Sequence, residues 1–107
     1  TAPSHNLDQK YGFTFLDCEF TCEGKNKIYL GRPWRDYGCS AFLNCKVIGD
    51  ILDSRGFDPW NNSGRDKTAR FSVYNLNVDT STFAPWVTRL SDEDSTKYTI
   101  DNIFNSI

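Results

Sequence analysis

A short pattern of aromatic and aliphatic residues occurs twice in the chain and constrains its fold more than any other feature. Residues 14–20 read Thr-Phe-Leu-Asp-Cys-Glu-Phe and residues 41–47 read Ala-Phe-Leu-Asn-Cys-Lys-Val, a spacing of 27 residues (45 − 18). A third, weaker copy at 69–76 places Phe71 in the position of Phe42, a spacing of 29 (71 − 42). Repeats of about 20 to 50 residues are typical of solenoids, propellers and arrays.

Each copy has the alternating character of a β-strand, and none has the period of a helix. Positions 16, 18 and 20 would share one face of the first strand, and positions 43, 45 and 47 the same face of the second. Stacked coils would then place like residues above like at about 4.8 Å. The pattern predicts an all-β parallel stack in which Cys18 and Cys45 are small core residues.

The connections and the C-terminal region have a different composition. Segments 23–27 and 55–64 carry the Gly, Asn and Pro of loops, and a loop as long as the second is usually functional. The strand pattern stops after Asp79, and Ser91 followed by acidic residues predicts a helix start, with a second turn from Thr99. We expect one unit over 1–107, with coils over about 1–79 and a short helical tail over about 80–107 that covers the open end of the stack.

The composition excludes several classes of function. The chain has 107 residues, 38% of them hydrophobic, and a formal net charge of −2 with interleaved signs, which argues against a nucleic-acid partner. No apolar run approaches the roughly 20 residues that span a bilayer, which argues against a membrane protein. The start at Thr1 carries no signal segment, so we expect any export signal to lie upstream and the chain to be a piece of a longer protein.

The cysteines and the histidine do not suggest a metal site. The four cysteines lack paired C-x-x-C spacing, and His5 is the single histidine, so we expect no metal and no cofactor. Cys22 and Cys39 flank the segment 29–34, and whether they form a disulfide stays open at this point.

The segment 29–37, Tyr-Leu-Gly-Arg-Pro-Trp-Arg-Asp-Tyr, concentrates cations and aromatic rings. Pro33 restricts Arg32 to an extended backbone, so we expect its guanidinium at a strand end. A guanidinium suits a carboxylate, and the indole of Trp34 suits the flat apolar face of a pyranose. The segment therefore suggests an acidic sugar or an enzyme carboxylate as partner, while a surface ion pair and a gap-filling tryptophan remain the plainer alternative.

Leu30-Gly31-Arg32-Pro33-Trp34 resembles a hallmark motif of pectin methylesterases. Further stretches resemble that family in the same order, so the resemblance covers nearly the whole chain: 1–4 with 11–12, 57–61, 74–75, 85–86, 90–93 and 98–103. The resemblance implies a right-handed single-stranded parallel β-helix. It also implies hydrolysis of galacturonate methyl esters to pectate and methanol, without a metal, by a secreted or periplasmic protein whose partner is pectin.

In the family, one aspartate attacks the ester carbonyl and a second acts as general acid, then base. The resemblance implies that Arg32 orients the nucleophilic aspartate, that Trp34 and Trp60 line the substrate cleft, and that Tyr37 lies at its rim. The family's aspartate-bearing motifs do not occur in this sequence, and none of Asp36, Asp50, Asp53 and Asp58 has their context. We therefore expect the nucleophile to lie outside this chain and the chain alone to be inactive.

Two departures and two alternatives accompany this resemblance. The family often has Gly-Trp-His-x-Trp where this chain has Gly-Phe-Asp-Pro-Trp at 56–60, and often an acidic residue where this chain has Val73. A non-catalytic module that binds oligogalacturonate through Trp34 and Trp60 is one alternative. Another polysaccharide-active β-helix enzyme, a lyase or glycoside hydrolase, is the other. Self-association through the truncated coil end is a further expectation.

Overall fold

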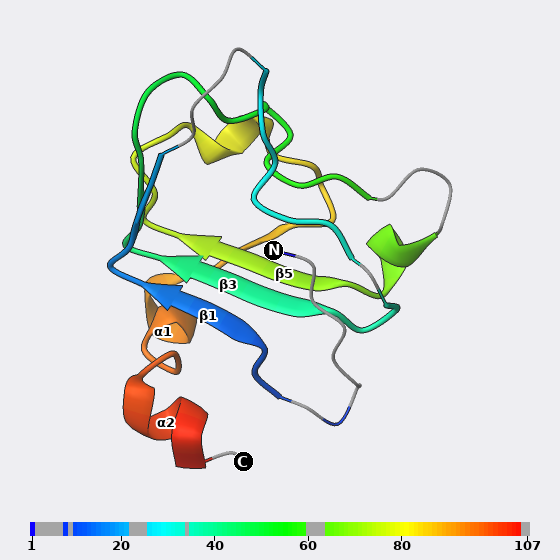
Figure 1. Ribbon diagram of the computed structural model, residues 1–107. Helices are drawn as coiled ribbons and strands as arrows, with labels where there is room; N and C mark the ends of the chain where they lie inside the picture. Colours follow the sequence, from blue (N-terminus) through cyan, green and yellow to red (C-terminus); the bar gives the residue numbers. More distant parts are fainter. Residues whose placement is uncertain (2–7, 9, 22–25, 34, 60–63, 106–107) are drawn as a thin grey trace.

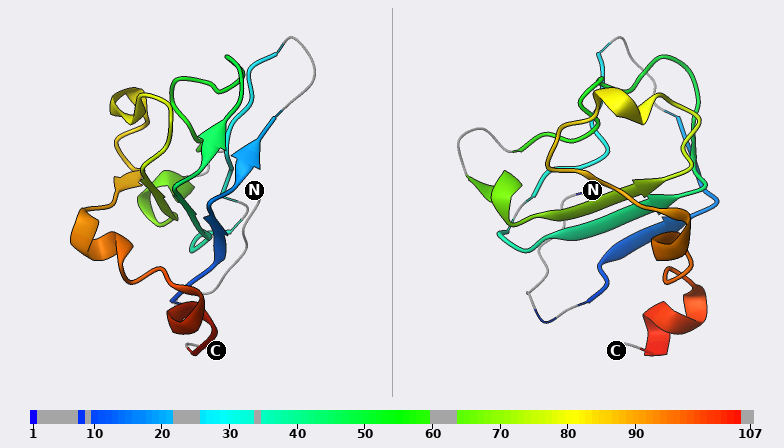
Figure 2. Two further views of the ribbon diagram at one scale, coloured as in Figure 1. Left: turned by 90° about the vertical axis from the view of Figure 1, so that its left-hand side faces the viewer. Right: turned by 180° about the vertical axis from the view of Figure 1, so that it is seen from behind.

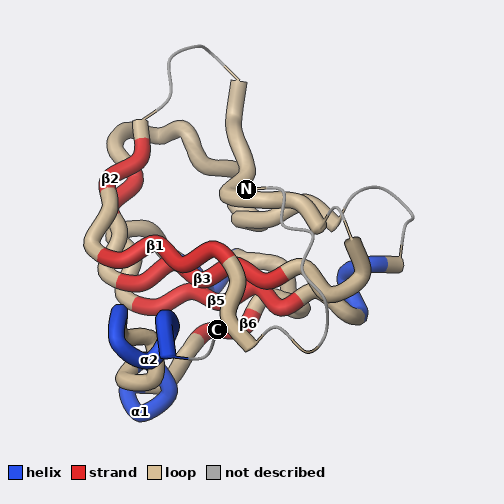
Figure 3. Tube along the Cα trace, turned by 60° about the horizontal axis from the view of Figure 1, so that its bottom comes forward, coloured by secondary structure: helices blue, strands red, loops and turns tan. Residues whose placement is uncertain are grey.

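The computed structural model describes residues 1, 8, 10–21, 26–33, 35–59 and 64–105. Its main feature is a four-stranded sheet with neighbouring strands parallel (Figure 1). In sheet order the strands are β1 (Phe13–Leu16), β3 (Cys39–Leu43), β5 (Arg70–Tyr74) and β6 (Thr88–Arg89). A second parallel pair, at the label β2 in Figure 3, consists of β2 (Glu19–Phe20) and β4 (Lys46–Val47).

Two isolated parallel bridges, Ile28 to Leu52 and Gly31 to Phe57, form a third line of contact. The chain runs from β1 through β2 to residues 28–31, and then from β3 through β4 to residues 52–57, which pair with 28–31. It therefore passes twice, in the same order, through the four-stranded sheet, the β2–β4 pair and the two bridges. Among the described residues the fold is mostly strands in parallel sheets with few helices, as the repeat predicted.

The register confirms the first repeat spacing and corrects the second. Phe15 pairs with Phe42, and β2 follows the same offset of 27 residues against β4. Phe42, however, pairs with Val73, an offset of 31 (73 − 42) rather than the predicted 29. A slip of two residues keeps the same side chains on each face of a strand, so alternation alone could not distinguish the two alignments.

Each copy of the repeat contains a corner that the sequence analysis placed inside one straight strand. Asp17, Asn44 and Asn75 have left-handed backbones with φ of 56°, 55° and 53°, a conformation that Asn and Asp tolerate better than most residues. Segments 14–20 and 41–47 are therefore each two strands in two different sheets. The corner also changes which residues face inward: Phe15 and Phe42 belong to the core cluster, where positions 16 and 43 were expected.

The core is a column of aromatic rings. Phe15 stacks on Phe42 with ring centroids 4.7 Å apart, and Phe57 contacts both Phe42 and Phe71 at 5.8 and 4.8 Å. Burying each such ring contributes about 1.5–3 kcal/mol. Cys45 is buried in the same cluster and Cys18 packs against it, which confirms both as core residues.

Short helices occur before β5 and in the C-terminal region. The helix η1 (Arg65–Lys67) precedes β5, and η2 (Thr80–Thr82), α1 (Asp92–Ser95) and α2 (Ile100–Asn105) lie in the tail. The side chain of Ser91 caps α1, accepting from the Asp94 amide over 3.1 Å, as predicted. The sheet continues to β6, beyond Asp79, because two exposed polar residues are enough to pair with β5 and leave no hydrophobic pattern.

The first part of the tail covers the end of the stack as expected, because β6 pairs with β5 and Phe83 and Val87 join the core. The helices α1 and α2 pack instead on the outer face of the four-stranded sheet (Figure 2). The Tyr74 hydroxyl on β5 bonds to Asp92, and the Tyr11 hydroxyl just before β1 donates to the Lys97 carbonyl over 2.7 Å. The rings of Tyr11 and Tyr98 meet edge to face at 5.3 Å. The core covers one side of β3 and the tail covers the other, so all five residues of β3 are buried. Within the described residues, no helix has the length and apolar character needed to cross a membrane.

Candidate functional site

Backbone hydrogen bonds on both sides hold the segment 28–33. The Arg32 amide donates to the Thr1 carbonyl over 2.9 Å, and the Leu30 amide donates to the Gly56 carbonyl over 2.7 Å. The Asp58 amide donates in turn to the Gly31 carbonyl over 3.1 Å. The segment therefore lies between Thr1 and residues 56–58, with its backbone donors and acceptors used by both neighbours.

The residues around Arg32 explain why this sequence suits the position. A Cβ atom at Gly31 would lie 2.5 Å from Oγ1 of Thr1, closer than real contacts allow, and 3.0 Å from the carbonyl oxygen of Thr1, which is a tight contact. Leu30 and Pro33 are buried beside it. Small and apolar residues thus fix the backbone, and the side chain of Arg32 is left partly exposed at the surface.

The Arg32 guanidinium contacts an aspartate and an aromatic ring. Its Nε donates to Oδ2 of Asp58 over 2.8 Å, and its Cζ lies 5.3 Å from the ring centre of Tyr29. The side chain of Arg32 is 43% exposed and that of Asp58 24%, so the pair is half-buried. Charge-assisted hydrogen bonds of this kind are about twice as strong as neutral ones.

The guanidinium of a second arginine, Arg55, also lies against the ring of Tyr29. The Cζ atom of Arg55 lies 5.2 Å from its ring centre, and Arg55 donates to the Tyr29 hydroxyl and to Oδ1 of Asp53. The backbone N–H of Arg55, followed by its side chain, holds the pKa of Asp53 below its usual value. We call Asp58, Arg32, Tyr29, Arg55 and Asp53 the Arg32 network; it links the segments 29–32 and 53–58.

The other predicted site residues are only partly placed. The side chain of Tyr37 is exposed, and its carbonyl oxygen accepts from the Arg70 guanidinium over 2.6 and 3.2 Å. Trp34, Trp60 and Cys22 lie outside the described residues. The structure therefore brings together Arg32 and Asp58, and the cleft-lining roles of the tryptophans and Tyr37 stay predictions.

The sequence analysis set Asp58 aside and missed Tyr29 and Arg55. A signal was present, since Gly31 and Phe57 are in register and the residues that follow them, Arg32 and Asp58, become neighbours. Nothing in the predicted loop 55–64 indicated that Phe57 would be a fully buried core residue. Without that assignment the register could not be derived.

The arrangement can present a fixed cation to a carboxylate. The described carboxylates of the network, Asp58 and Asp53, are both engaged by arginines, so neither is set up as a nucleophile. Among the residues that the structure describes, no group of three His, Cys, Asp or Glu side chains could hold a metal ion.

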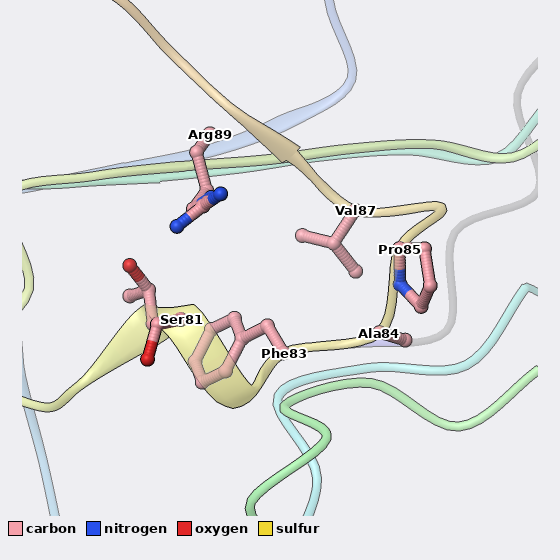
Figure 4. A pocket seen from close by; sticks show the side chains of 7 residues that line it. Ser81, Phe83, Ala84, Pro85, Val87 and Arg89 are labelled. Atoms are coloured by element: carbon pink, nitrogen blue, oxygen red, sulfur yellow. The ribbon is translucent and has the colours of Figure 1, made fainter.

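A pocket of about 280 Å³ lies between η2 and β6 (Figure 4). Seven residues line it: Thr80, Ser81, Phe83, Ala84, Pro85, Val87 and Arg89. Arg89 is the charged member of this set, which contains no carboxylate or imidazole. The pocket therefore offers no acid–base pair, and the Arg32 network is the stronger candidate site.

Comparison with known proteins decides the family. The sequence model described as Pectinesterase matches residues 1–106. The chain belongs to the pectinesterase family. The match runs through the Arg32 network and the C-terminal tail alike, so it covers the whole folded part described above.

Named pectinesterases of Arabidopsis thaliana show the same relationship. "Putative pectinesterase 11" is 30% identical over 84% of this chain and 26% of its own length, and "Probable pectinesterase 55" is 35% identical over 80% and 26%. "Pectinesterase QRT1" is 36% identical over 60% of this chain and 16% of its own length. The chain thus spans about a quarter or less of these pectinesterases. No solved structure matches it significantly.

Proposed function

We propose that this chain is the C-terminal part of a pectin methylesterase, which hydrolyses the methyl esters of homogalacturonan to pectate and methanol. The observation that carries the proposal is the family match over residues 1–106, in which Arg32 stands partly exposed in the family's Leu-Gly-Arg-Pro-Trp motif. The chain matches only 26% of the length of these relatives, which supports the proposal that it is part of a longer protein.

The proposed architecture is a right-handed single-stranded parallel β-helix. The parallel pairing of neighbouring strands, and the repeated passage of the chain through the same three sets of contacts, support stacked coils. Parallel strands joined by crossovers are right-handed in nearly all proteins, which favours that hand. The first coils would run over about 1–79 and the tail over about 80–107, as one unit.

In the proposed reaction, an aspartate outside this chain attacks the ester carbon, and a second aspartate protonates the departing methoxide, which leaves as methanol. Water then hydrolyses the acyl-aspartate, giving a free galacturonate and restoring both carboxyl groups. Arg32 keeps the nucleophile ionised and directed, because a nearby positive charge stabilises a carboxylate. Trp34, Trp60 and Tyr37 would contact the polysaccharide, and no cofactor takes part.

The remaining parts of the proposal follow from the substrate. A cell-wall polysaccharide requires a protein that acts outside the cell, so the complete protein would be secreted. Nucleic acids and membranes would not be partners. The isolated chain would associate with itself through its exposed coil end, where Phe13 is 50% exposed, and sedimentation over a range of concentrations would show it.

Methanol release from highly methylated pectin tests the proposal. The assay compares the chain alone with the chain joined to its upstream sequence, each also as the Arg32→Ala variant. Activity only in the joined, unmutated protein is the expected result. If the chain alone is active, the location of the nucleophile is wrong. If no protein is active but oligogalacturonate binds, the alternative of a non-catalytic binding module replaces the enzyme.

A further inference from the structure

Asp58 lies beside Arg32 because the backbone places it there. Gly31 and Phe57 form a parallel bridge, and the Asp58 amide donates to the Gly31 carbonyl over 3.1 Å. The next residues on the two segments, Arg32 and Asp58, therefore sit at the same level about 4.8 Å apart along the backbone stack. The strand register brings the two side chains together, so the entropy lost in forming their ion pair is small.

The pair restrains the guanidinium on two sides. On one side, Nε of Arg32 donates to Oδ2 of Asp58 over 2.8 Å. On another, the ring of Tyr29 lies against the guanidinium, with its centre 5.3 Å from Cζ. Rotation about the terminal bonds of Arg32 would give up both contacts. Asp58 and Tyr29 therefore both restrain the direction of the cation, although the side chain is 43% exposed.

Tyr29 is itself restrained from the other side. Arg55 stacks on the ring at 5.2 Å and donates to its hydroxyl, while Asp53 holds Arg55 by an ion pair at 3.4 Å. The neighbouring Tyr29 is the main cause that raises the pKa of Arg55. The platform under Arg32 is thus part of a network and not a loose surface ring.

We propose that Asp58 is a positioning residue for Arg32, with Tyr29 as the platform on which the guanidinium is held. In the complete enzyme the Arg32 guanidinium would then already have the direction in which it contacts the nucleophilic carboxylate. The catalytic consequence rests on the proposed function of Arg32. Outer partners that fix the direction of a catalytic group typically affect activity without touching substrate.

Hydrogen exchange of the Arg32 Nε–H by NMR tests the positioning itself, on the chain joined to its upstream sequence. The resonance is assigned with Arg32→Lys. Exchange should be faster by at least about 10-fold in Asp58→Asn, because the charge-assisted acceptor is lost. The matched control is Asp50→Asn, which removes another surface ion pair, to Lys27 at 2.6 Å, and should leave Arg32 exchange unchanged. Equal exchange in Asp58→Asn and the unmutated protein would overturn the proposal.

Kinetics on the same proteins test the catalytic consequence. Asp58→Asn should lower kcat by about 10- to 100-fold with KM little changed, and Asp58→Glu should recover part of the loss. Asp50→Asn should keep full activity, and melting temperatures separate this effect from unfolding. An unchanged kcat in Asp58→Asn would remove the catalytic role. If the unmutated joined protein releases no methanol, the proposed function fails, while the exchange measurement still decides whether Asp58 positions Arg32.

Discussion

The side-chain amide of Asn75 donates to Oδ1 of Asn44 over 2.8 Å, and both residues have left-handed backbones. They follow β5 and β3 at equivalent places, where the chain turns out of the four-stranded sheet. The corner is therefore stabilised twice, by residues that tolerate a positive φ and by an amide contact between successive turns.

Asn44→Ala should destabilise the protein by about 2–3 kcal/mol, since alanine pays about 1–2 kcal/mol for the left-handed backbone and loses a hydrogen bond worth about 1 kcal/mol. Asn44→Gly is the matched control, because glycine accepts the backbone and loses only the amide contact. Urea unfolding of both variants gives the two free energies. Equal losses for alanine and glycine would show that the backbone conformation contributes little.

Replacement of Phe57 by the tryptophan that the family often has at this place should be unfavourable here. Phe57 is 0% exposed, and its ring lies against those of Phe42, Phe71, Phe83 and Trp86. A larger ring in a full core costs about 1–3 kcal/mol. Phe13→Trp, at a side chain 50% exposed, is the control and should change stability by less than about 0.5 kcal/mol. Stabilisation by Phe57→Trp would indicate an unfilled cavity.

Stability should fall in acid through two carboxylates that bind backbone amides. The Arg55 amide lowers the pKa of Asp53, and the side chain and amide of Ser81 lower that of Asp79. Both folded pKa values lie below the usual 3.8, so the contribution is complete above that pH and is lost as pH falls through the folded values. The free energy of unfolding of Asp53→Asn and Asp79→Asn should approach that of the unmutated protein towards pH 2. A difference that stays constant from pH 7 to pH 2 would contradict this linkage.

The contact between the tail and the start of β1 should be measurable. Tyr11→Phe removes the hydrogen bond to Lys97 and should cost about 0.5–1.5 kcal/mol, while it keeps the ring against Tyr98. Tyr11→Ala should cost about 0.5–1.5 kcal/mol more, because the ring pair is lost as well. Unfolding free energies distinguish the two steps. No difference between the phenylalanine and alanine variants would mean that the rings contribute nothing.

The sequence predicted the parts of the fold that depend on hydrophobic pattern and local capping. The spacing between Phe15 and Phe42, the core positions of Cys18 and Cys45, and the cap at Ser91 are confirmed. What failed depends on contacts between distant segments. The register of β5, the corner at Asn44 and the burial of Phe57 follow from how coils stack. An alternating pattern fits equally well when a strand is shifted by two residues, so it cannot determine that stacking.

The candidate site shows the same division. Pro33 predicted an extended backbone that presents Arg32, and the structure places Arg32 partly exposed beside the bridge at Gly31. The partner of Arg32 could not be predicted, because Asp58 reaches it only through the pairing of Gly31 with Phe57. Local chemistry indicates that a cation is presented, and the long-range register decides what holds it.

The path of the tail affects how such a stack comes apart. In a linear array each layer touches only its neighbours, so the ends can fray while the middle persists. Here the chain leaves β6, crosses the sheet and joins Lys97 to Tyr11 across 86 residues of sequence. Loosening of the first layer therefore loosens the last, and the terminal layers lose their independence. We expect unfolding to be cooperative along the full length, and refolding to wait for a contact between the two ends of the polypeptide, which makes it slow.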